Sequence, residues 1–191
     1  MKKNKIRKKI IEIRKGLDSK TVDSNSRKIL KKLFRMEEFR RAKKVMFYSS
    51  FGNEVSTEKM IEKSLKLKKQ VFLPKILKGK IVPVQIENLK ELVLGKFGIL
   101  EPKVTMECRL RPADFDVIIV PGVAFDKNCN RIGFGKGYFD RFLKTQKAKK
   151  IGLAHSFQIV KKIPAGKFDV PMDLVITEKN IFRKARIEAH E

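Results

Sequence analysis

The stretch DVIIVPGVAFDKNCNRIGFGKGYFDRFL, residues 116–143, decides the fold. Its apolar run at 117–120 has the length of a buried strand, and the Pro-Gly pair after it ends that strand. A long polar loop follows and leads into a glycine-rich turn at 133–137. The apolar spacing after this turn predicts a helix over about 137–146. The stretch therefore predicts a strand, a long loop, a glycine turn and a helix, in that order.

The glycine turn has the composition of a phosphate-binding loop. Gly133, Gly135 and Gly137 let the backbone approach a bulky anion, and the helix start after them offers unpaired N–H groups. Arg131 and Lys136 lie in the same loop and are able to neutralise phosphate charge. The Gly-x-Gly-x-Gly spacing is neither the dinucleotide fingerprint nor a P-loop. By spacing alone, a phosphate site and a glycine-rich surface turn both remain open.

Composition points to a basic globular protein of one domain, residues 1–191. Lys and Arg number 46 against 21 Asp and Glu, so the formal net charge is +25, which implies anionic partners or a lysine-rich solvated surface. The lysines are dispersed, and the aromatic residues, 8% of the chain, are mostly Phe within apolar runs. Because nucleic-acid binding needs clustered cations with interleaved stacking rings, no nucleic-acid partner is expected.

Cysteine usage and hydropathy indicate a cytoplasmic location. Cys108 and Cys129 form no C-x-x-C pair, which fits a reduced compartment better than a disulfide scaffold. His155 and His190 are too few for a His-rich metal site. The basic N-terminus lacks the apolar core of a signal peptide, and no apolar run approaches membrane-spanning length. We therefore expect a soluble, cytoplasmic, monomeric protein with no membrane partner.

Helical and strand patterns alternate along the chain, which predicts an α/β protein with a largely parallel sheet covered on both faces. The loop after residue 120 lies at the carboxyl end of a strand, where ligands bind in such sheets. Pro83 indicates an edge strand and Pro74 the end of a strand. Helices are predicted at 3–15, from 18 onward and at 57–69, the last with Ser56 as a candidate cap. Strands are predicted at 44–49, 71–74, 81–86, 150–155, 174–177 and 180–183, and residues 95–102 form a loop with a short extended piece.

Two further features have both a functional and an ordinary interpretation. Lys3 and Arg7 are four residues apart, so they share a helix face and suit a polyphosphate, although the segment is rich in cations throughout. Glu54 precedes a helix, where a negative charge is favourable whatever its function.

The glycine turn and its flanks resemble a known enzyme family. The runs PGVAFD at 121–126 and RIGFGKGYFD at 131–140 resemble the signature of the 5-formyltetrahydrofolate cyclo-ligase family. Weaker similarities follow in the same order: the Lys3 and Arg7 pair, EVST at 54–57, GILEP at 98–102 and the acidic segment with Asp169 and Asp173. The resemblance covers nearly the whole chain and implies a single Rossmann-like three-layer domain. Departures occur at Cys129, Phe134, Phe139 and Phe168, and none removes a charge that the chemistry needs.

The resemblance implies a reaction that depends on ATP and Mg²⁺. The enzyme would convert 5-formyltetrahydrofolate to 5,10-methenyltetrahydrofolate, with phosphorylation of the formyl oxygen and release of ADP and phosphate. The excess of lysine would favour substrates with an anionic polyglutamate tail. Two alternatives remain: a basic nucleic-acid-binding protein, and a sugar-phosphate isomerase on a similar fold, which needs no ATP.

The resemblance also assigns roles to residues. Arg131 and Lys136 are the candidate catalytic cations, and Asp140 and Asp169 the candidate metal ligands, with Asp173 as an alternative to Asp169. Asp140 would also favour a helix start by charge alone. The candidate substrate-binding residues are Glu54, Phe134 and Tyr138, although Tyr138 is equally suited to the core. The candidate ATP-binding residues are Lys3, Arg7, Arg131, Ile132, Gly133, Phe134, Gly135, Lys136 and Gly137.

Overall fold

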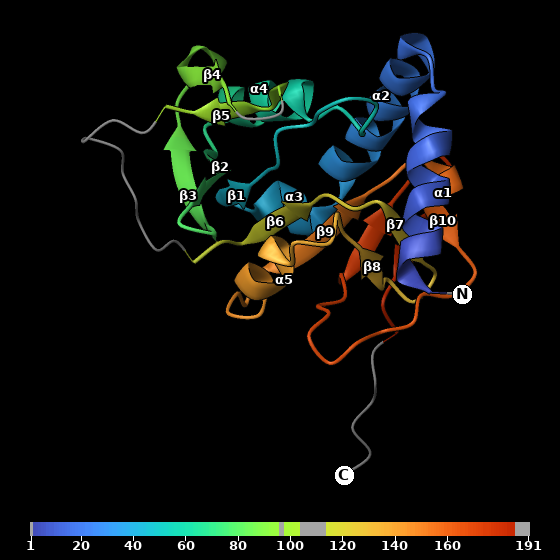
Figure 1. Ribbon diagram of the computed structural model, residues 1–191. Coiled ribbons are helices and arrows are strands. Elements are labelled where there is room, and N and C mark those ends of the chain that lie inside the picture. The colour runs from blue at the N-terminus through green and yellow to red at the C-terminus, as the bar shows by residue number, and fades with distance from the viewer. Residues whose placement is uncertain (1, 96–97, 104–113, 186–191) are drawn as a thin grey trace.

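The computed structural model describes residues 2–95, 98–103 and 114–185 (Figure 1). A seven-stranded sheet forms its centre, with parallel pairing from β11 to β2 and one antiparallel strand at each edge. The α/β prediction with a largely parallel sheet is therefore confirmed. In spatial order the strands are β12 (Ile181–Arg183), β11 (Leu174–Ile176), β9 (Lys149–Leu153), β6 (Val117–Val120), β1 (Lys44–Met46), β2 (Gln70–Leu77) and β3 (Lys80–Ile86).

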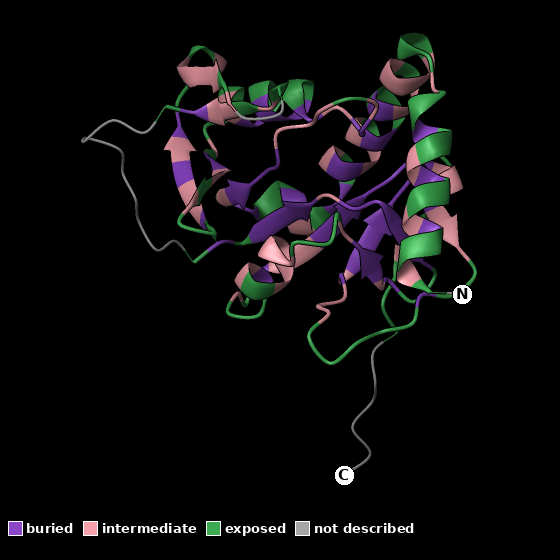
Figure 2. Ribbon diagram, in the orientation of Figure 1, coloured by how far each residue is buried: buried purple, intermediate pink, exposed green. Residues whose placement is uncertain are grey.

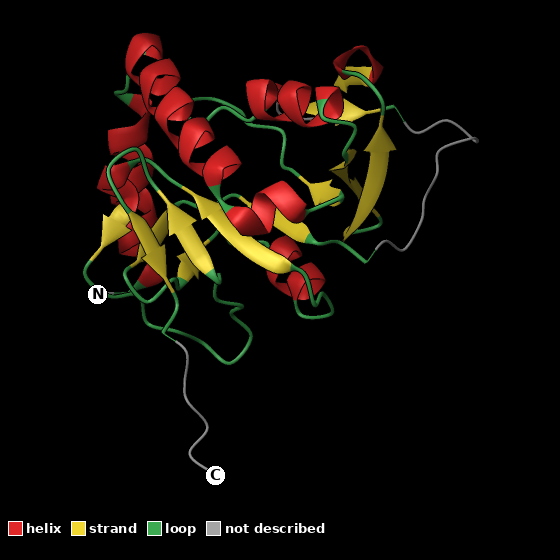
Figure 3. Cartoon of the chain, turned by 180° about the vertical axis from the view of Figure 1, so that it is seen from behind, coloured by secondary structure: helices red, strands yellow, loops and turns green. Residues whose placement is uncertain are grey.

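Apolar side chains cover both faces of this sheet. Figure 2 shows the central strands coloured as buried. On one face Ile29, Phe39 and Met60 pack from three helices, which Figure 3 shows in front of the sheet. On the other face Leu143 packs beside Phe125. The predicted three-layer arrangement is therefore confirmed. The helices are α1 (Lys3–Lys15), α2 (Ser19–Arg35), α3 (Glu37–Arg41), α4 (Glu58–Lys66) and α5 (Tyr138–Leu143).

A second, small sheet packs against α1. Ile6 and Ile10 recur at helical spacing on α1 and pack on Ala124 and Ile132 of this small sheet. The helix ends at Gly16, and the Asp18 carboxylate then caps α2 by accepting a hydrogen bond from the Thr21 N–H across 2.8 Å. The small sheet has the order β10 (Ile159–Val160), β7 (Ala124–Asp126), β8 (Arg131–Ile132), and a two-stranded pair joins β4 (Leu92–Leu94) to β5 (Leu100–Pro102).

The strand order reverses between β1 and β6, which are parallel neighbours. From β1 the chain proceeds outward to β2, whereas from β6 it proceeds the other way to β9 and β11. In open α/β sheets such a reversal leaves a crevice beyond the carboxyl ends of the two strands, and ligands bind there. The loops after Met46 and after Val120 leave the sheet at this point.

Several predicted boundaries were wrong. Pro74 does not end its strand, because β2 continues to Leu77 and Pro74 lies opposite Pro83 in the antiparallel pair with β3. Pairing with β1 has already ended at Phe72, so the missing N–H of Pro74 leaves no gap in that ladder. Ser56 is not a helix cap, because α4 begins at Glu58 and follows Thr57.

The region between the strand at 117–120 and the glycine turn is not a long polar loop. It contains β7 and β8, and all the residues of these two strands are buried. Phe125 and Ile132 belong to the apolar clusters. The helix after the turn is also shorter than predicted, since it ends at Leu143. The predicted strands at 44–49 and 150–155 are likewise shorter, and α3 was not predicted. Cys108 and His190, for which the sequence analysis made predictions, lie outside the described residues.

Candidate active site

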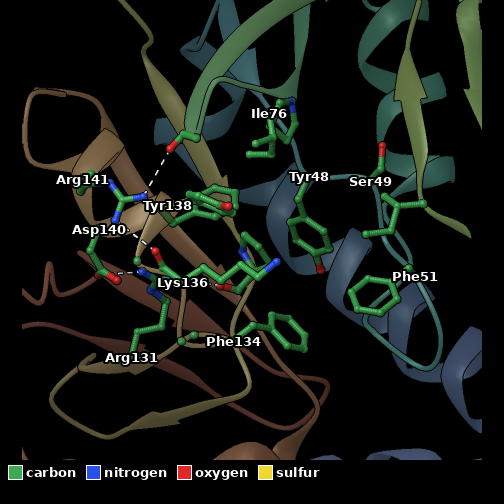
Figure 4. Close-up of a pocket in the computed structure, with 18 of the residues that line it drawn as sticks. Tyr48, Ser49, Phe51, Ile76, Arg131, Phe134, Lys136, Tyr138, Asp140 and Arg141 are labelled. Atoms are coloured by element: carbon green, nitrogen blue, oxygen red, sulfur yellow. Dashed lines mark hydrogen bonds and ion pairs between the residues drawn. The ribbon is translucent and has the colours of Figure 1, made fainter. Parts of the chain in front are cut away.

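A cavity of about 1910 Å³ opens at the switch point of the sheet, and Figure 4 shows part of its lining. The loop after β1 contributes Tyr48 and Glu54, β8 contributes Arg131, and the glycine turn follows β8. The start of α1 adds Lys3 and Arg7. The predicted site residues that line it are Lys3, Arg7, Glu54, Arg131, Ile132, Gly133, Phe134, Gly135, Lys136, Gly137, Tyr138, Asp140 and Asp169.

The glycine turn lines the cavity, and its position is fixed by its backbone conformation and by contacts with Arg7 of α1. Gly135 and Gly137 have φ of 108° and 66°, a region that side chains with a Cβ rarely adopt. Arg7 donates from Nε to the Gly133 carbonyl oxygen across 2.8 Å, and its guanidinium lies over Gly135. The predicted phosphate-binding cation of α1 is thus placed against the predicted phosphate-binding turn.

Arg131 and Asp140 form an ion pair at the floor of the turn. Arg131 Nη2 lies 2.7 Å from Asp140 Oδ1, and Nη1 donates to the Pro121 carbonyl oxygen across 3.2 Å (Figure 4). The Arg131 side chain is only 3% exposed, whereas that of Asp140 is 24% exposed and lines the cavity. Arg131 Nε is buried without a hydrogen-bond partner among the described residues.

Lys3 and Asp169 form a second ion pair beside that of Arg131 and Asp140. Lys3 donates from Nζ to Asp169 Oδ2, which also accepts the Gly166 N–H across 2.6 Å. Burial alone would raise the pKa of Asp169, but the Lys3 and Gly166 hydrogen bonds outweigh it and hold the pKa below its ordinary value. The Val170 N–H donates to Asp140 Oδ1 across 3.3 Å, which ties the Asp169 segment to Asp140.

Asp140 and Asp169 are also suited by type to a magnesium ion. Both are carboxylates that line one cavity, and Mg²⁺ is usually bound by one or two carboxylates, several waters and substrate phosphates. The described residues contain no cluster of three or more potential metal-binding side chains, which such a site does not require. Asp173, the alternative, instead accepts the Lys150 N–H across 2.7 Å, at the junction of two strands.

The other end of the cavity is built around a buried carboxylate. Glu54 is 6% exposed, and its Oε1 lies 3.2 Å from Arg14 Nη1. Burial raises the pKa of Glu54 to about 7, although the Arg14 charge opposes this rise. The rings of Tyr48, Phe51 and Phe134 lie on this side, away from Arg131 and Asp140 (Figure 4).

Sequence reasoning missed several residues of the cavity. Tyr48 follows β1 at the switch point, so the strand order would have indicated it once the sheet was known. Lys75 on β2 pairs with Glu101 on β5 across 2.5 Å, and two strands distant in sequence gave no signal for this contact. Arg141 donates to the carbonyl oxygens of Lys136 and Gly79 across 3.0 and 3.3 Å, which joins the turn to the β2–β3 hairpin.

Fold and cavity together define a class of protein: an α/β protein with a cation-rich cavity at the switch point of its sheet. A family model described as "5-formyltetrahydrofolate cyclo-ligase family" matches residues 1–178. The chain therefore belongs to the 5-formyltetrahydrofolate cyclo-ligase family, as the resemblance implied. This membership identifies it as a ligase of folate metabolism and favours that reading over the nucleic-acid-binding and isomerase alternatives.

Individual relatives agree with the family match. The chain is 31% identical over 177 residues to 5-formyltetrahydrofolate cyclo-ligase of Haemophilus influenzae, covering 90% of this chain and 95% of that one. The solution structure of Aquifex aeolicus 5,10-methenyltetrahydrofolate synthetase superposes with a TM-score of 0.85 at 37% identity, covering all of both chains. The Mycoplasma pneumoniae synthetase gives a TM-score of 0.74 at 29% identity, covering 93% of this chain and 99% of that one.

Proposed function

We propose that this cyclo-ligase, a single domain over residues 1–191, uses ATP and Mg²⁺ to convert 5-formyltetrahydrofolate to 5,10-methenyltetrahydrofolate. The observation that carries the proposal is the sharing of one cavity by a cation-rich glycine turn, two carboxylates and the buried Glu54. The cavity volume, about 1910 Å³, exceeds the roughly 300–1,000 Å³ of a site for one small ligand. That volume supports simultaneous binding of a nucleotide and a folate.

The end with the glycine turn suits the phosphates of ATP. Phosphoryl transfer needs charge neutralisation and alignment more than covalent chemistry by the protein. The turn at 133–137 would bind phosphate oxygens through backbone N–H groups, and Lys3, Arg7, Arg131 and Lys136 would offset the charge. Arg131 and Lys136 would act on the charge that develops during transfer, which is the role proposed for them as catalytic residues.

Asp140 and Asp169 would hold Mg²⁺, directly or through water. The bound ion would supply charge neutralisation at the phosphates. In the structure each carboxylate is paired with a cation, Asp140 with Arg131 and Asp169 with Lys3. These two cations would turn from the carboxylates toward the phosphates when the substrates bind.

The end with Glu54 suits the folate. Its carboxylate would accept hydrogen bonds from the pteridine, and the faces of Phe134 and Tyr138 would pack against the pteridine and formyl portion. The formyl oxygen attacks the γ-phosphorus, an O–P bond forms, and the bond to ADP breaks. The second folate nitrogen then attacks the formyl carbon and releases its proton to solvent, the ring closes, and the C–O bond breaks as the phosphorylated oxygen departs as phosphate. No protein nucleophile takes part.

The rim of the cavity favours a substrate with a negative tail. Lys78 and Lys144 line it together with Arg141. We include polyglutamylated 5-formyltetrahydrofolate among the proposed substrates, and we propose a monomeric, cytoplasmic enzyme. No helix in the described ranges has the length and apolar character needed to cross a membrane. Equal KM values for mono- and polyglutamate substrates at low salt would argue against the preference for a tail.

The test is formation of the methenyl product, followed by its near-ultraviolet absorbance. Purified protein is mixed with 5-formyltetrahydrofolate, ATP and Mg²⁺, and each component is then omitted in turn. A rise that requires all three is expected. A rise without ATP, or no rise beside an active relative measured in parallel, would overturn the proposal.

A further inference from the structure

Arg14 is a buried cation that the proposed reaction does not use. It lies in the last turn of α1, is 7% exposed, and pairs with Glu54, whose own side chain is 6% exposed. Burying an arginine costs free energy unless a partner compensates it, so an isolated arginine at this position would be unfavourable. The partner is the carboxylate at the folate end of the cavity. This pairing gives the arginine a link to the site.

Arg14 reaches the cavity only through other residues. It lines a narrow crevice behind Glu54 that has no room for a water molecule. Its guanidinium carbon lies 5.4 Å from the ring centre of Phe134 and 5.9 Å from that of Phe51, and these two rings face the cavity. The two ring centres are 5.6 Å apart, and Figure 4 shows the rings as neighbours. The rings therefore separate Arg14 from bound substrate.

The loop that carries Glu54 is fixed to the same end of α1 by the side chain of Asn53. Asn53 donates from Nδ2 to the carbonyl oxygens of Arg14 and Leu17 across 3.0 and 2.8 Å. Glu54 Oε2 accepts the Phe51 N–H across 3.3 Å, so both carboxylate oxygens are held. The helix thus determines both where the loop lies and where its carboxylate points.

The same helix face also reaches the phosphate end. Lys3, Arg7 and Arg14 are separated by four and seven residues, a spacing that aligns them on one face of a helix. At 1.5 Å per residue the first and last lie about 16 Å apart along the axis. Arg7 holds the glycine turn at Gly133, and Arg14 contacts Phe134 of the same turn and Glu54 of the opposite loop.

We propose that Arg14 is a positioning residue that holds the Glu54 carboxylate for the folate substrate. The inference rests on the proposed function, because it names a second residue of the folate end. Arg14 contacts neither reacting atom, so it acts through Glu54.

The charged and titratable groups around Glu54 make its ionisation a direct readout of Arg14. Two such groups face its carboxylate, Arg14 from α1 and Tyr48 after β1, whereas His155 after β9 lies against the Glu54 backbone. Burial raises the pKa of Tyr48 well above 10 and lowers the pKa of His155 below 6.5. Burial raises the pKa of Glu54 to about 7, and loss of the Arg14 charge moves this pKa further upward.

The experiment measures this ionisation in protein without added substrates. Glutamate side-chain carboxyls are labelled with ¹³C, and the Glu54 signal is assigned as the one missing from Glu54→Gln. Arg14→Met should raise the titration midpoint by roughly one pH unit or more, as expected for loss of an adjacent opposite charge. Arg14→Lys should return it part of the way. Lys15→Met is the matched control, since Lys15 is an exposed cation of the same helix turn. The titration midpoint of Glu54 in this variant should equal that in the parent protein.

Substrate binding is the second readout. Arg14→Met should weaken 5-formyltetrahydrofolate about fivefold at pH 7, because a pKa raised by about one unit leaves fewer molecules ionised, and the loss should shrink at pH 9. ATP affinity should stay within about twofold of the parent, by the additivity of distant sites. An unmoved midpoint, or a loss that affects both substrates and persists at pH 9, would overturn the inference. Failure of the parent protein to bind 5-formyltetrahydrofolate would instead overturn the proposed function. The Glu54 titration needs no substrate, so it would still test whether Arg14 influences the pKa of Glu54.

Discussion

Arg131 Nη2 lies 2.7 Å from Asp140 Oδ1, so the proposed cation for phosphate and the proposed ligand for metal form one ion pair. The same relationship recurs between Lys3 and Asp169. The cavity therefore carries compensated charge before it meets a substrate. Because magnesium and ATP bring charges of opposite sign, they can replace both partners together without leaving a charge unpaired.

Asp140→Asn should weaken magnesium use while preserving the fold. The amide keeps an oxygen that accepts from Arg131 and the Val170 N–H, but it loses the charge that a hard cation requires. We expect the magnesium concentration for half-maximal activity to rise at least about tenfold, in the range seen when a metal site loses support. Activity is followed against magnesium concentration at saturating ATP.

Asp173→Asn is the matched control for this prediction. Asp173 accepts the Lys150 N–H and lies outside the cavity lining among the described residues, so its variant should change thermal stability and not magnesium dependence. A magnesium shift in Asp173→Asn, with none in Asp169→Asn, would identify Asp173 as the ligand in place of Asp169.

Arg131→Lys should be nearly as harmful as removal of the side chain. Arg131 uses two separate nitrogens, one on Asp140 and one on the Pro121 carbonyl oxygen, and a lysine has a single nitrogen on a flexible stem. We expect kcat to fall by about 10²–10³, as when one preorganised donor is removed from a transition state. Arg183→Lys, an exposed arginine that pairs with Glu38, is the control and should leave kcat unchanged.

The sequence indicated which residues share the cavity better than it predicted the path of the chain. The motif at 131–140 placed the glycine turn, the metal-type carboxylate and the aromatic side chain correctly in one cavity. Local spacing suffices there, because these residues are contiguous and their backbone conformation follows from glycine. The small sheet was missed because β7 and β8 are only three and two residues long, too short for periodicity to reveal.

Contacts between segments that are distant in the sequence could not be predicted from local sequence patterns. Arg14 appeared in the sequence as one more cation of a basic helix, and only the packing of α1 beside the Glu54 loop buries it. Glu54 was interpreted as a helix-start charge or a folate contact, and neither interpretation predicted its burial. Pro74 was taken as a strand end because its pairing with Pro83 depends on the hairpin geometry.

The ionisation of Glu54 should appear in the pH dependence of stability. Burial raises its pKa from an ordinary 4.5 to about 7, so the folded protein holds a proton that the unfolded chain releases. The stabilisation from this group is fully present below pH 4.5 and is lost as pH rises through about 7. Glu54→Gln lacks this titration. The free energy of unfolding of the parent protein should therefore fall relative to that of the variant as pH rises from 5 to 8, by about 1.4 kcal/mol for each unit by which the folded pKa is raised.

Chemical denaturation at a series of pH values measures this difference. Glu58→Gln is the control, since Glu58 is exposed at the start of α4 and its variant should run parallel to the parent protein. Parallel curves for Glu54→Gln as well would mean that burial does not raise the pKa of Glu54 in the folded protein.

Gly137→Ala should damage the phosphate end through backbone strain. Gly137 has φ of 66° immediately before α5, and an added Cβ would lie 3.0 Å from Arg141 Nη1. A residue with a Cβ costs about 1–2 kcal/mol in this conformation, so the variant should lose that much stability and should raise the KM for ATP if the turn relaxes. Gly16→Ala offers the matched comparison, because Gly16 has φ of −77° and a Cβ there meets its nearest atom at 3.5 Å. Its replacement should be neutral or slightly stabilising, so equal losses in the two variants would show that the left-handed conformation of Gly137 is not what the turn requires.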